Sequence, residues 1–428
     1  MSLRRVAVIA GYRTPFVRVG TDFVEMTAID LAKNAMAELV NRTEIPLKEI
    51  DEVAMGISVP KPSTGNLARI AALGIGIPKN VHCYHMQLAC ASSILTSATV
   101  AMSIATGQAD VGIAGGAESL SDMPIMVGEP VRKAVMAAQA KKTVEEQFMT
   151  IGSVPLMHFI PQPPPLQEAY TGLTMGEHTE LMVQEWGVTR EEQDDYAFRT
   201  HKLAGEAIAD GRIPLEVAPV IAPPNFVPVT KDNLVRPNPD RAKMAMLPPA
   251  FDKVVGTITA ANSSPLTDGA AVVLLMAEEK AKALGYTPIA FIKSFGFSGV
   301  DLDVGMLFGP AYSTPRALKN AGLKLSDIDL VEMHEAFAGQ VLCNLKAFTA
   351  KDWLEKNVGL SEPIGEVNMD RFNMMGGSIS LGHPFGATGA RMITTCANQL
   401  PRVGGTYGLL TACAANGTGG AMMLERAS

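Results

Sequence analysis

The sequence lacks the features that mark secreted, membrane-spanning and nucleic-acid-binding proteins. Only 5 of its 428 residues are cysteines, without a Cys-x-x-Cys pair or zinc-ligand spacing, so we expect neither a disulfide framework nor a metal site. No stretch reaches the roughly 20 consecutive apolar residues of a membrane-spanning helix, and the apolar run 6–10 is too short for a signal peptide. The 36 basic and 43 acidic side chains give a net charge of −7, which excludes a dominant nucleic-acid-binding surface. We therefore expect a cytoplasmic protein without a nucleic-acid partner.

Aromatic and charged residues are also scarce, at 6% and 18%, whereas 47% of the residues are hydrophobic. A chain of this composition has ample material for buried cores and is not disordered. The 39 glycines and 28 prolines suit an α/β protein with many tight turns. The length predicts two or three domains.

Two segments near opposite ends of the chain share the pattern Ile-Asp-x-Val-x-Met. One lies in residues 46–55, after an amphipathic helix expected at 29–41, and the other in residues 324–333, after a helix expected at 315–321. Chance similarity of two helix-to-strand joints would explain the match by itself. In both halves, however, Gly-rich turns, Ala-rich helices and short apolar strands follow. We therefore predict two similar layered α/β domains with mixed, parallel-rich sheets.

Residues from about 120 to 250 differ in composition from the rest of the chain and interrupt the first domain, which resumes at Gly256. They contain a basic helical stretch at 131–142, a proline-rich connector at 161–165 and a polar helix at about 189–210. Proline lacks the N–H that helices and inner strands need, so the connector is expected on the surface. Acidic residues early in the polar helix suit the positive end of its dipole.

Cys90 is a candidate nucleophile. It stands at the start of an Ala/Ser/Thr-rich run that ends near Gly107 and is typical of a tightly packed helix. The free N–H groups and the dipole at a helix start favour a thiolate, so we expect a lowered thiol pKa. The alternative is a buried structural cysteine, which is the usual fate of a free thiol.

Three further segments carry candidate functional groups. His383 lies in a turn dense in glycine, 376–389, where the following proline fixes the backbone, and it could accept the Cys90 proton or donate to an oxyanion. Cys413 directly follows an apolar strand, a position at which α/β proteins present catalytic groups. His334 begins the segment His-Glu-Ala-Phe-Ala, after the second repeat strand. The last two segments are weak signals alone, and their joint occurrence is a much stronger one.

Together these segments resemble the thiolases in order and spacing. The resemblance covers essentially the whole chain and includes Asn-Ser-Ser-Pro-Leu-Thr-Asp-Gly at 262–269. It implies the thiolase fold, with two similar α/β domains, five-stranded mixed sheets and layered α-β-α-β-α packing. The domains would be 1–278 and 279–428, with a loop-domain excursion at about 120–250. The family normally assembles as homodimers or homotetramers.

The resemblance also implies an activity, that of a 3-ketoacyl-CoA thiolase, an acyltransferase of fatty acid β-oxidation. Cleavage of a 3-ketoacyl thioester needs a soft nucleophile and a proton donor for the leaving enolate. By similarity, Cys90 attacks C3 and becomes the acyl-enzyme, and His383 deprotonates it. Cys413 protonates the departing acetyl-CoA carbanion. The backbone N–H groups of Cys90 and Ala415 would form an oxyanion site.

Two departures from the commonest thiolase pattern bear on substrate preference. His334 stands where the usual box begins with Asn, and this variant is familiar in the β subunit of trifunctional fatty-acid oxidation complexes. By similarity, His334 holds a water in a further oxyanion site. Cys413 is followed by Ala-Ala-Asn in place of x-Gly-Gly. Ala415 supplies the same N–H as glycine, provided that its φ is negative.

For CoA, similarity indicates Ser264 and Ala260 near the pantetheine, Phe337 beside its thiol end, Met175 in the excursion and Arg236 at the nucleotide part. Each of these residues is otherwise read as ordinary packing or solvated surface. No dinucleotide fingerprint or metal-ligand cluster occurs in the sequence. We expect CoA and acyl-CoA as substrates, with no permanently bound cofactor and no metal.

Two other functions stay open. An acetyl-CoA C-acetyltransferase that forms acetoacetyl-CoA would use the same catalytic residues. An inactive thiolase-like lipid-binding or scaffold protein would normally have lost one member of the set formed by Cys90, His383 and Cys413.

The stretch 127–168 combines basic and apolar side chains and is longer than the loops of short biosynthetic thiolases. It resembles the helical insertion of trifunctional-complex β subunits. This resemblance predicts contact with a hydratase/dehydrogenase α subunit or peripheral contact with a membrane. The alternative is a lid that packs only on its own domain.

Overall fold

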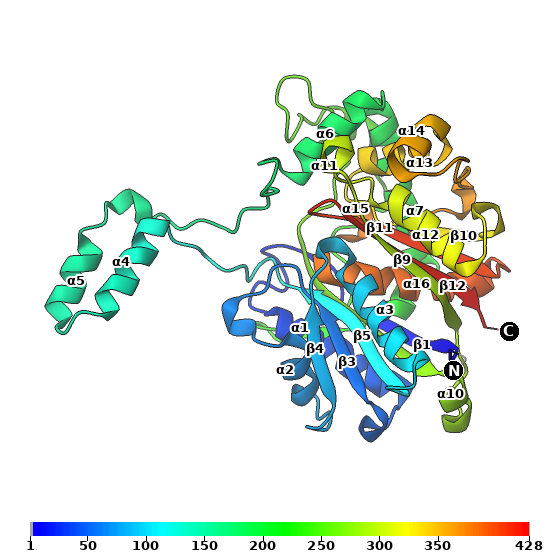
Figure 1. Ribbon diagram of the computed structural model, residues 1–428, viewed down its shortest axis with the longest axis horizontal. Coiled ribbons are helices and arrows are strands. Elements are labelled where there is room, and N and C mark those ends of the chain that lie inside the picture. Colours follow the sequence, from blue (N-terminus) through cyan, green and yellow to red (C-terminus); the bar gives the residue numbers. More distant parts are fainter. Residues whose placement is uncertain (1–2, 428) are drawn as a thin grey trace. The chain divides into compact units, whose positions relative to one another are not determined.

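The computed structural model describes residues 3–427, which form two compact units (Figure 1). The body holds residues up to Val59, Thr64–Asp122 and the chain from Gln167 onward, whereas the insertion unit holds Pro60–Ser63 and Met123–Leu166. The excursion was expected over about 120–250. Only its earlier part, Met123–Leu166, lies in the insertion unit, and the rest belongs to the body. Within residues 3–427, no helix is long and apolar enough to cross a membrane.

The body is built on two half-sheets with equivalent strand order. The first runs β4-β3-β5-β8-β1 and the second β10-β11-β12-β9, and a short antiparallel pairing of β1 with β9 joins them. In each half, the strand that contains the end of the repeat pattern, β3 or β10, is parallel to its inner neighbour, and the next two pairings are antiparallel. The strands are β1 (Val6–Arg13), β2 (Val17–Arg18), β3 (Glu52–Gly56), β4 (His82–Met86), β5 (Val111–Glu118), β6 (Val220–Ala222), β7 (Val227–Val229), β8 (Thr267–Ala277), β9 (Ala290–Gly299), β10 (Leu330–Met333), β11 (Tyr407–Ala414) and β12 (Thr418–Arg426).

The helices form the outer and middle layers. On the outer faces, α1 and α2 pack against the first half-sheet, and α12 and α13 against the second. In the middle, α3 and α16 share one apolar cluster with strands from both half-sheets. The helices are α1 (Ala28–Thr43), α2 (Leu67–Gly74), α3 (Ser92–Ala105), α4 (Glu129–Gln139), α5 (Val144–Gly152), α6 (Met175–Glu185), α7 (Arg190–Ala209), α8 (Arg212–Glu216), α9 (Arg241–Ala245), α10 (Glu278–Leu284), α11 (Leu302–Gly305), α12 (Gly309–Ala321), α13 (Ala338–Thr349), α14 (Lys351–Val358), α15 (Ser378–Leu381) and α16 (Thr388–Arg402).

This topology confirms the two similar layered α/β domains predicted from the repeat. Helix α1 precedes β3 and helix α12 precedes β10, and a 3-10 turn lies between helix and strand in both halves. The helix expected at 315–321 begins earlier, at Gly309. Sequence rules place proline in a first turn, but Pro310 occupies that turn and Pro315 lies inside the helix.

The second half-sheet has four strands where five were expected. At the fifth position, one isolated bridge joins Val331 of β10 to Phe372. The chain cannot continue as a strand there, because Met369–Arg371 forms a 3-10 turn and Asn373 has a φ of 45°. The Asn373 side chain instead bonds the backbone N–H and C=O of Met333, at 2.8 and 2.9 Å. A side chain thus completes part of the ladder that a fifth strand would have formed.

Helices α3 and α16 approach each other closely in the middle layer, from opposite halves of the chain. Gly389 permits this approach, since a Cβ at its position would lie 2.6 Å from the backbone nitrogen of Ile94. Cys90 lies just before α3 and His383 just before α16. The contact between the two helices therefore brings the two predicted catalytic segments together.

Candidate active site

Cys90 lies in a tight turn between β4 and α3. The turn is a single 3-10 segment, Ala89–Ala91, and Ala89 has a φ of 43°, a left-handed conformation that is uncommon for a residue with a side chain. The Ser92 hydroxyl holds the turn by accepting from the N–H of Leu88 at 2.8 Å and donating to the C=O of Ala89 at 2.7 Å. Backbone strain of this kind clusters at functional sites. It presents the partly exposed Cys90 at the start of α3, as the sequence predicts.

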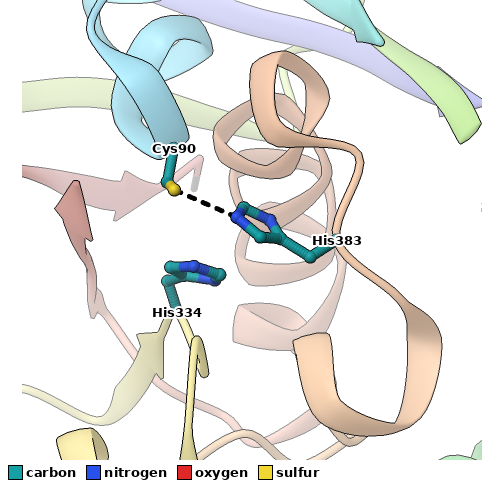
Figure 2. Close-up of side chains that lie close together, drawn as sticks. All are labelled: Cys90, His334 and His383. Atoms are coloured by element: carbon teal, nitrogen blue, oxygen red, sulfur yellow. Dashed lines mark hydrogen bonds between the residues drawn. The ribbon is translucent and has the colours of Figure 1, made fainter. Parts of the chain in front are cut away.

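His383 is held in one orientation by three contacts. Its backbone N–H donates to the Thr267 hydroxyl at 2.9 Å, and its Nδ1 lies 2.6 Å from the hydroxyl of Thr388. That hydroxyl donates to the C=O of Pro384, so it accepts the proton of Nδ1. The unprotonated Nε2 then faces the Sγ of Cys90 at 3.0 Å (Figure 2). The pair is therefore set up for transfer of the thiol proton to the imidazole.

His334 lies beside this pair and completes a cluster of three side chains (Figure 2). It follows strand β10, and its backbone N–H donates to the C=O of Thr411 at 2.9 Å. Its ring centroid is 4.0 Å from that of His383, and its Nδ1 lies 2.8 Å from the Ser378 hydroxyl. Its Nε2 is buried and has no hydrogen-bond partner among the described residues. The cluster thus contains one nitrogen whose partner must come from outside the protein.

Cys413 reaches the cluster from the end of β11. Its side chain is buried and interacts electrostatically with the Cys90 thiol. Two residues later, the backbone N–H of Ala415 lowers the pKa of the Cys90 thiol, as does the N–H of Cys90 itself. Left-handed backbone begins only at Asn416, with a φ of 63°, so Ala415 meets the requirement of a negative φ. The two N–H groups predicted for an oxyanion site therefore both favour negative charge at the Cys90 sulfur.

Burial decides the protonation of Cys90 and His383, and one of our predictions about the thiol pKa is wrong. The helix start was expected to lower the thiol pKa, but burial raises the pKa of Cys90 to about 12, against the two N–H groups that lower it. Burial also lowers the pKa of His383 to about 3, with a further contribution from Arg391. Both groups are neutral near pH 7, so the resting site holds a thiol and an imidazole rather than an ion pair.

Glu118 is a site residue that the sequence reasoning missed. Its carboxylate, at the end of β5, accepts the backbone N–H groups of Ser58, Val59 and Gly386, each at 2.9 Å. Burial raises its pKa to about 7, against these bonds, and its charge raises the pKa of Cys90. It ties the turn that carries His383 to the first half-sheet. The available signal for Glu118 was its position, since a carboxylate there ends a run of buried apolar and glycine residues, 111–118.

Glu335, in the box that begins with His334, was also missed as a positioning residue. It accepts from the Tyr196 hydroxyl and the Asn373 amide, both at 2.7 Å, and from the Thr200 hydroxyl at 3.0 Å. These partners lie on α7 and beside the edge of β10. They fix the box against the glycine-rich turn, and each is far from Glu335 in sequence.

Three of the residues predicted to contact CoA lie around the same box. The N–H of Ser264 donates to the C=O of Ala336 at 2.9 Å, and the neighbouring Ser263 forms a bridge with Phe337. Met175, the first residue of α6, packs in the same apolar cluster as Phe337. Ser264, Phe337 and Met175 are thus brought toward one region by three separate segments.

The other two predicted CoA contacts are on exposed loops. Ala260 lies on the surface between β7 and β8. Arg236 is exposed, and its backbone N–H donates to Nδ1 of His201 at 3.3 Å. A role for either in CoA binding stays a prediction.

Comparison with known proteins gives one consistent family. The model of the thiolase N-terminal domain matches residues 6–279, and that of the thiolase C-terminal domain matches residues 286–426. The 3-ketoacyl-CoA thiolases of Aeromonas salmonicida and Aliivibrio fischeri are each 46% identical to the chain over 421 residues, which is 98% of this chain and 97% and 95% of theirs.

Two solved structures are similar over nearly their whole length. Human mitochondrial 3-ketoacyl-CoA thiolase in complex with CoA has a TM-score of 0.83 and 29% identity, covering 100% of both chains. The acetyl-CoA acetyltransferase of Bacillus anthracis has a TM-score of 0.84 and 32% identity, covering 99% of both.

Alkylation of Cys90 in the free protein should accelerate steadily with pH. Only the thiolate reacts with iodoacetamide, and burial raises the thiol pKa to about 12. The alkylation rate of Cys90 should therefore rise about tenfold per pH unit between pH 7 and 10. The alkylation rate of free cysteine, with a pKa of about 8.5, should level off within the same range. Mass spectrometry of the Cys90 peptide, with free cysteine in the same solution as control, measures both. A plateau below pH 8 would show a thiolate–imidazolium pair instead.

Proposed function

Because the chain belongs to the thiolase family, we propose that it is a 3-ketoacyl-CoA thiolase, which cleaves 3-ketoacyl-CoA with CoA into acetyl-CoA and a shortened acyl-CoA. The names of relatives at 46% identity support this activity. The observation that carries it is the 3.0 Å contact of Cys90 Sγ with His383 Nε2, at a thiol whose pKa two backbone N–H groups lower.

In the first step, Cys90 attacks the C3 carbonyl of the substrate. The thiol proton passes to Nε2 of His383, whose other nitrogen is already bonded to Thr388. Because both groups are neutral beforehand, charge develops only as the new S–C bond forms. Preorganised N–H donors are then most effective, since they need no rearrangement to meet a developing oxyanion. The backbone N–H groups of Cys90 and Ala415 are the donors that we assign.

Collapse of the adduct breaks the C2–C3 bond and leaves the acyl group on Cys90. The acetyl-CoA carbanion that departs must take up a proton, and Cys413 is the donor that we assign. Burial raises the pKa of the Cys413 thiol well above its usual value, so the thiol holds its proton until the carbanion forms. Attack of a CoA thiol on the acyl-enzyme then releases the shortened acyl-CoA.

His334 and the CoA contacts complete the proposal. The unpartnered Nε2 of His334, beside His383, would hold a water or the thioester oxygen of the substrate. CoA serves as a substrate, consistent with the human relative in complex with CoA. We assign its contacts to Ser264, Ala260, Phe337, Met175 and Arg236, and propose no permanently bound cofactor.

An acetyl-CoA C-acetyltransferase is the second candidate function. It is supported by the structure of the Bacillus anthracis acetyl-CoA acetyltransferase, at a TM-score of 0.84. The catalytic cluster would be the same in both enzymes, and the acyl pocket would differ. Steady-state thiolysis of substrates from acetoacetyl-CoA to long-chain 3-ketoacyl-CoA separates the two. Activity confined to acetoacetyl-CoA would favour the acetyltransferase.

Assembly into a homodimer or homotetramer through the edge of the first half-sheet is part of the proposal. Strand β4 is the last strand of that sheet, and its outer residues His82 and His85 are exposed. An unpaired edge presents free N–H and C=O groups that a second copy can pair with. We place the enzyme in the cytoplasm.

We propose that the insertion unit docks on an α subunit or on a membrane surface. Its helices α4 and α5 carry apolar side chains exposed by more than half, among them Phe148 and Met149, and Leu156 in the following turn is 86% exposed. Residues 123–166 contain four basic and three acidic side chains, and Arg132 is already paired with Glu129 at 2.6 Å. Apolar burial therefore supplies most of the attraction, with a smaller electrostatic contribution.

Brief mixing with acetyl-CoA should acetylate Cys90. The adduct should be lost in Cys90→Ser, because an alcohol is a far weaker nucleophile than a thiol near neutral pH. Mass spectrometry of the digested protein detects it, and Cys343→Ser, at a buried thiol on α13, is the matched control that should keep the adduct. Acetylation that survives Cys90→Ser would remove Cys90 from the mechanism.

The two reactive cysteines should separate in an exchange experiment. Cys413→Ala should slow the exchange of the acetyl-CoA α-protons with deuterated solvent by about 10²-fold or more, the usual contribution of a positioned acid or base. Acylation of Cys90 should persist, because thiol attack needs no proton transfer at carbon. Deuterium incorporation is followed by mass spectrometry. Undiminished exchange would assign the carbon acid–base role to another group.

Replacing residues 131–160 with a short Gly/Ser linker should abolish co-purification with an α subunit or salt-sensitive binding to anionic vesicles. Thiolysis of short substrates should be unchanged, because the catalytic cluster lies outside this segment. A matched variant with Gln at Arg132, Lys133, Lys141 and Lys142 should lose only the salt-dependent part. If the linker variant binds as well as the parent, the insertion unit is only a lid.

A further inference from the structure

The catalytic cluster contains three potential metal ligands. The Sγ of Cys90 and one ring nitrogen each of His334 and His383 all lie within 4.8 Å of one another. Figure 2 shows the three side chains converging from separate elements. A thiolate with two imidazole nitrogens is a donor set suited to Zn²⁺ and related soft or borderline divalent ions.

The second ring nitrogen of each histidine is already engaged. Nδ1 of His383 is bonded to Thr388 at 2.6 Å, and Nδ1 of His334 to Ser378 at 2.8 Å. Metal-binding histidines characteristically use such a bond to fix the ring and its tautomer. The remaining Nε2 of His334 is fully buried and lacks a partner among the described residues. An orphaned nitrogen on a ring whose centroid lies 4.0 Å from that of His383 is an independent indication of a ligand.

We propose that Cys90, His334 and His383 form a reversible inhibitory site for Zn²⁺ or a chemically similar divalent cation. Zn–N distances of about 2.0–2.1 Å and a Zn–S distance of about 2.3 Å place the ligand atoms of a tetrahedral site about 3.3–3.6 Å apart. The observed distances bracket this range: the Cys90 Sγ and His383 Nε2 atoms, 3.0 Å apart, would open slightly, and the three atoms, which lie within 4.8 Å of one another, would draw together. The Cys90 thiol releases one proton to solvent as the S–Zn bond forms, both imidazoles bind through lone pairs, and water fills the fourth position.

Occupancy would block the reaction because the metal and the substrate need the same sulfur. The site differs from a resident cofactor site, since the ion must leave before Cys90 can be acylated. His334 sets its selectivity. An Asn at this position, as in the commoner thiolase box, offers an amide oxygen, which is a poorer zinc ligand than imidazole. The third strong zinc ligand is therefore supplied only where the box begins with His, as in His-Glu-Ala-Phe-Ala here.

Metal binding can be tested without turnover, so its outcome does not depend on the proposed thiolase activity. The reduced, chelator-treated full chain is titrated with Zn²⁺ against a chromophoric chelator, and with Co²⁺ to observe the sulfur-to-cobalt charge-transfer band. One ion per chain is expected. His334→Asn should weaken Zn²⁺ binding at least tenfold, and Cys90→Ala should remove the cobalt band.

The control is Cys83→Ser, at the partly exposed thiol that lies on β4 between His82 and His85. This variant should bind both ions as the parent does. Loss of binding in it would place the ion on β4 and overturn the proposal, as would unchanged affinity in His334→Asn.

Thermal unfolding checks that each variant is folded. If His334→Asn is not folded, a His334→Gln variant takes its place. The zinc affinity of that variant, the cobalt band in the parent and the absence of the band in Cys90→Ala then decide the question. In the parent, Zn²⁺ should also stop acetylation of Cys90, and EDTA should restore it. Acetylation that proceeds at saturating Zn²⁺ would contradict inhibition.

Discussion

The site depends on a close approach of two backbone segments from opposite halves of the chain. A Cβ at Gly116 on β5 would lie 1.9 Å from the C=O of Gly386, and one at Gly386 would lie 2.6 Å from the C=O of Gly56. These glycines let the turn that carries His383 rest directly on the first half-sheet. The 3.0 Å contact with Cys90 follows from that packing. The glycine density between 376 and 389 is therefore a geometric requirement of the site.

The same close packing buries most of the cluster, and this burial sets the protonation of its groups. Burial is the largest influence on the pKa of Cys90, Cys413 and His383, and in each case it favours the neutral form. The resting cluster therefore pays little for buried charge. In the proposed mechanism, charge develops only during reaction, beside the backbone N–H groups that we assign as donors. Glu118 is a buried carboxyl in the same region, and three N–H groups surround it.

The features that were predicted from sequence are local, and those that were missed are long-range. The repeated Ile-Asp-x-Val-x-Met pattern predicted the duplicated topology, and the segments around Cys90, His383 and Cys413 named the cluster that the structure brings together. The bond between Glu118 and Gly386 joins residues 268 positions apart, so no sequence window contains it. The thiol pKa was predicted in the wrong direction because a helix start is visible in sequence, whereas the depth of burial is set by tertiary packing.

The role that we propose for His334 comes at a cost to stability. Burying a polar atom without a partner costs about 1–3 kcal/mol, and Nε2 of His334 is such an atom. The cost is offset when a substrate oxygen or a water supplies the missing bond. The free energy recovered in this way adds to the affinity of the site for that ligand. Asn could hold a water at this position without presenting a strong metal ligand. In our proposals, the tautomer of His334 with the proton on Nε2 would donate to an oxyanion, and the tautomer with the proton on Nδ1 would offer the Nε2 lone pair to a soft cation.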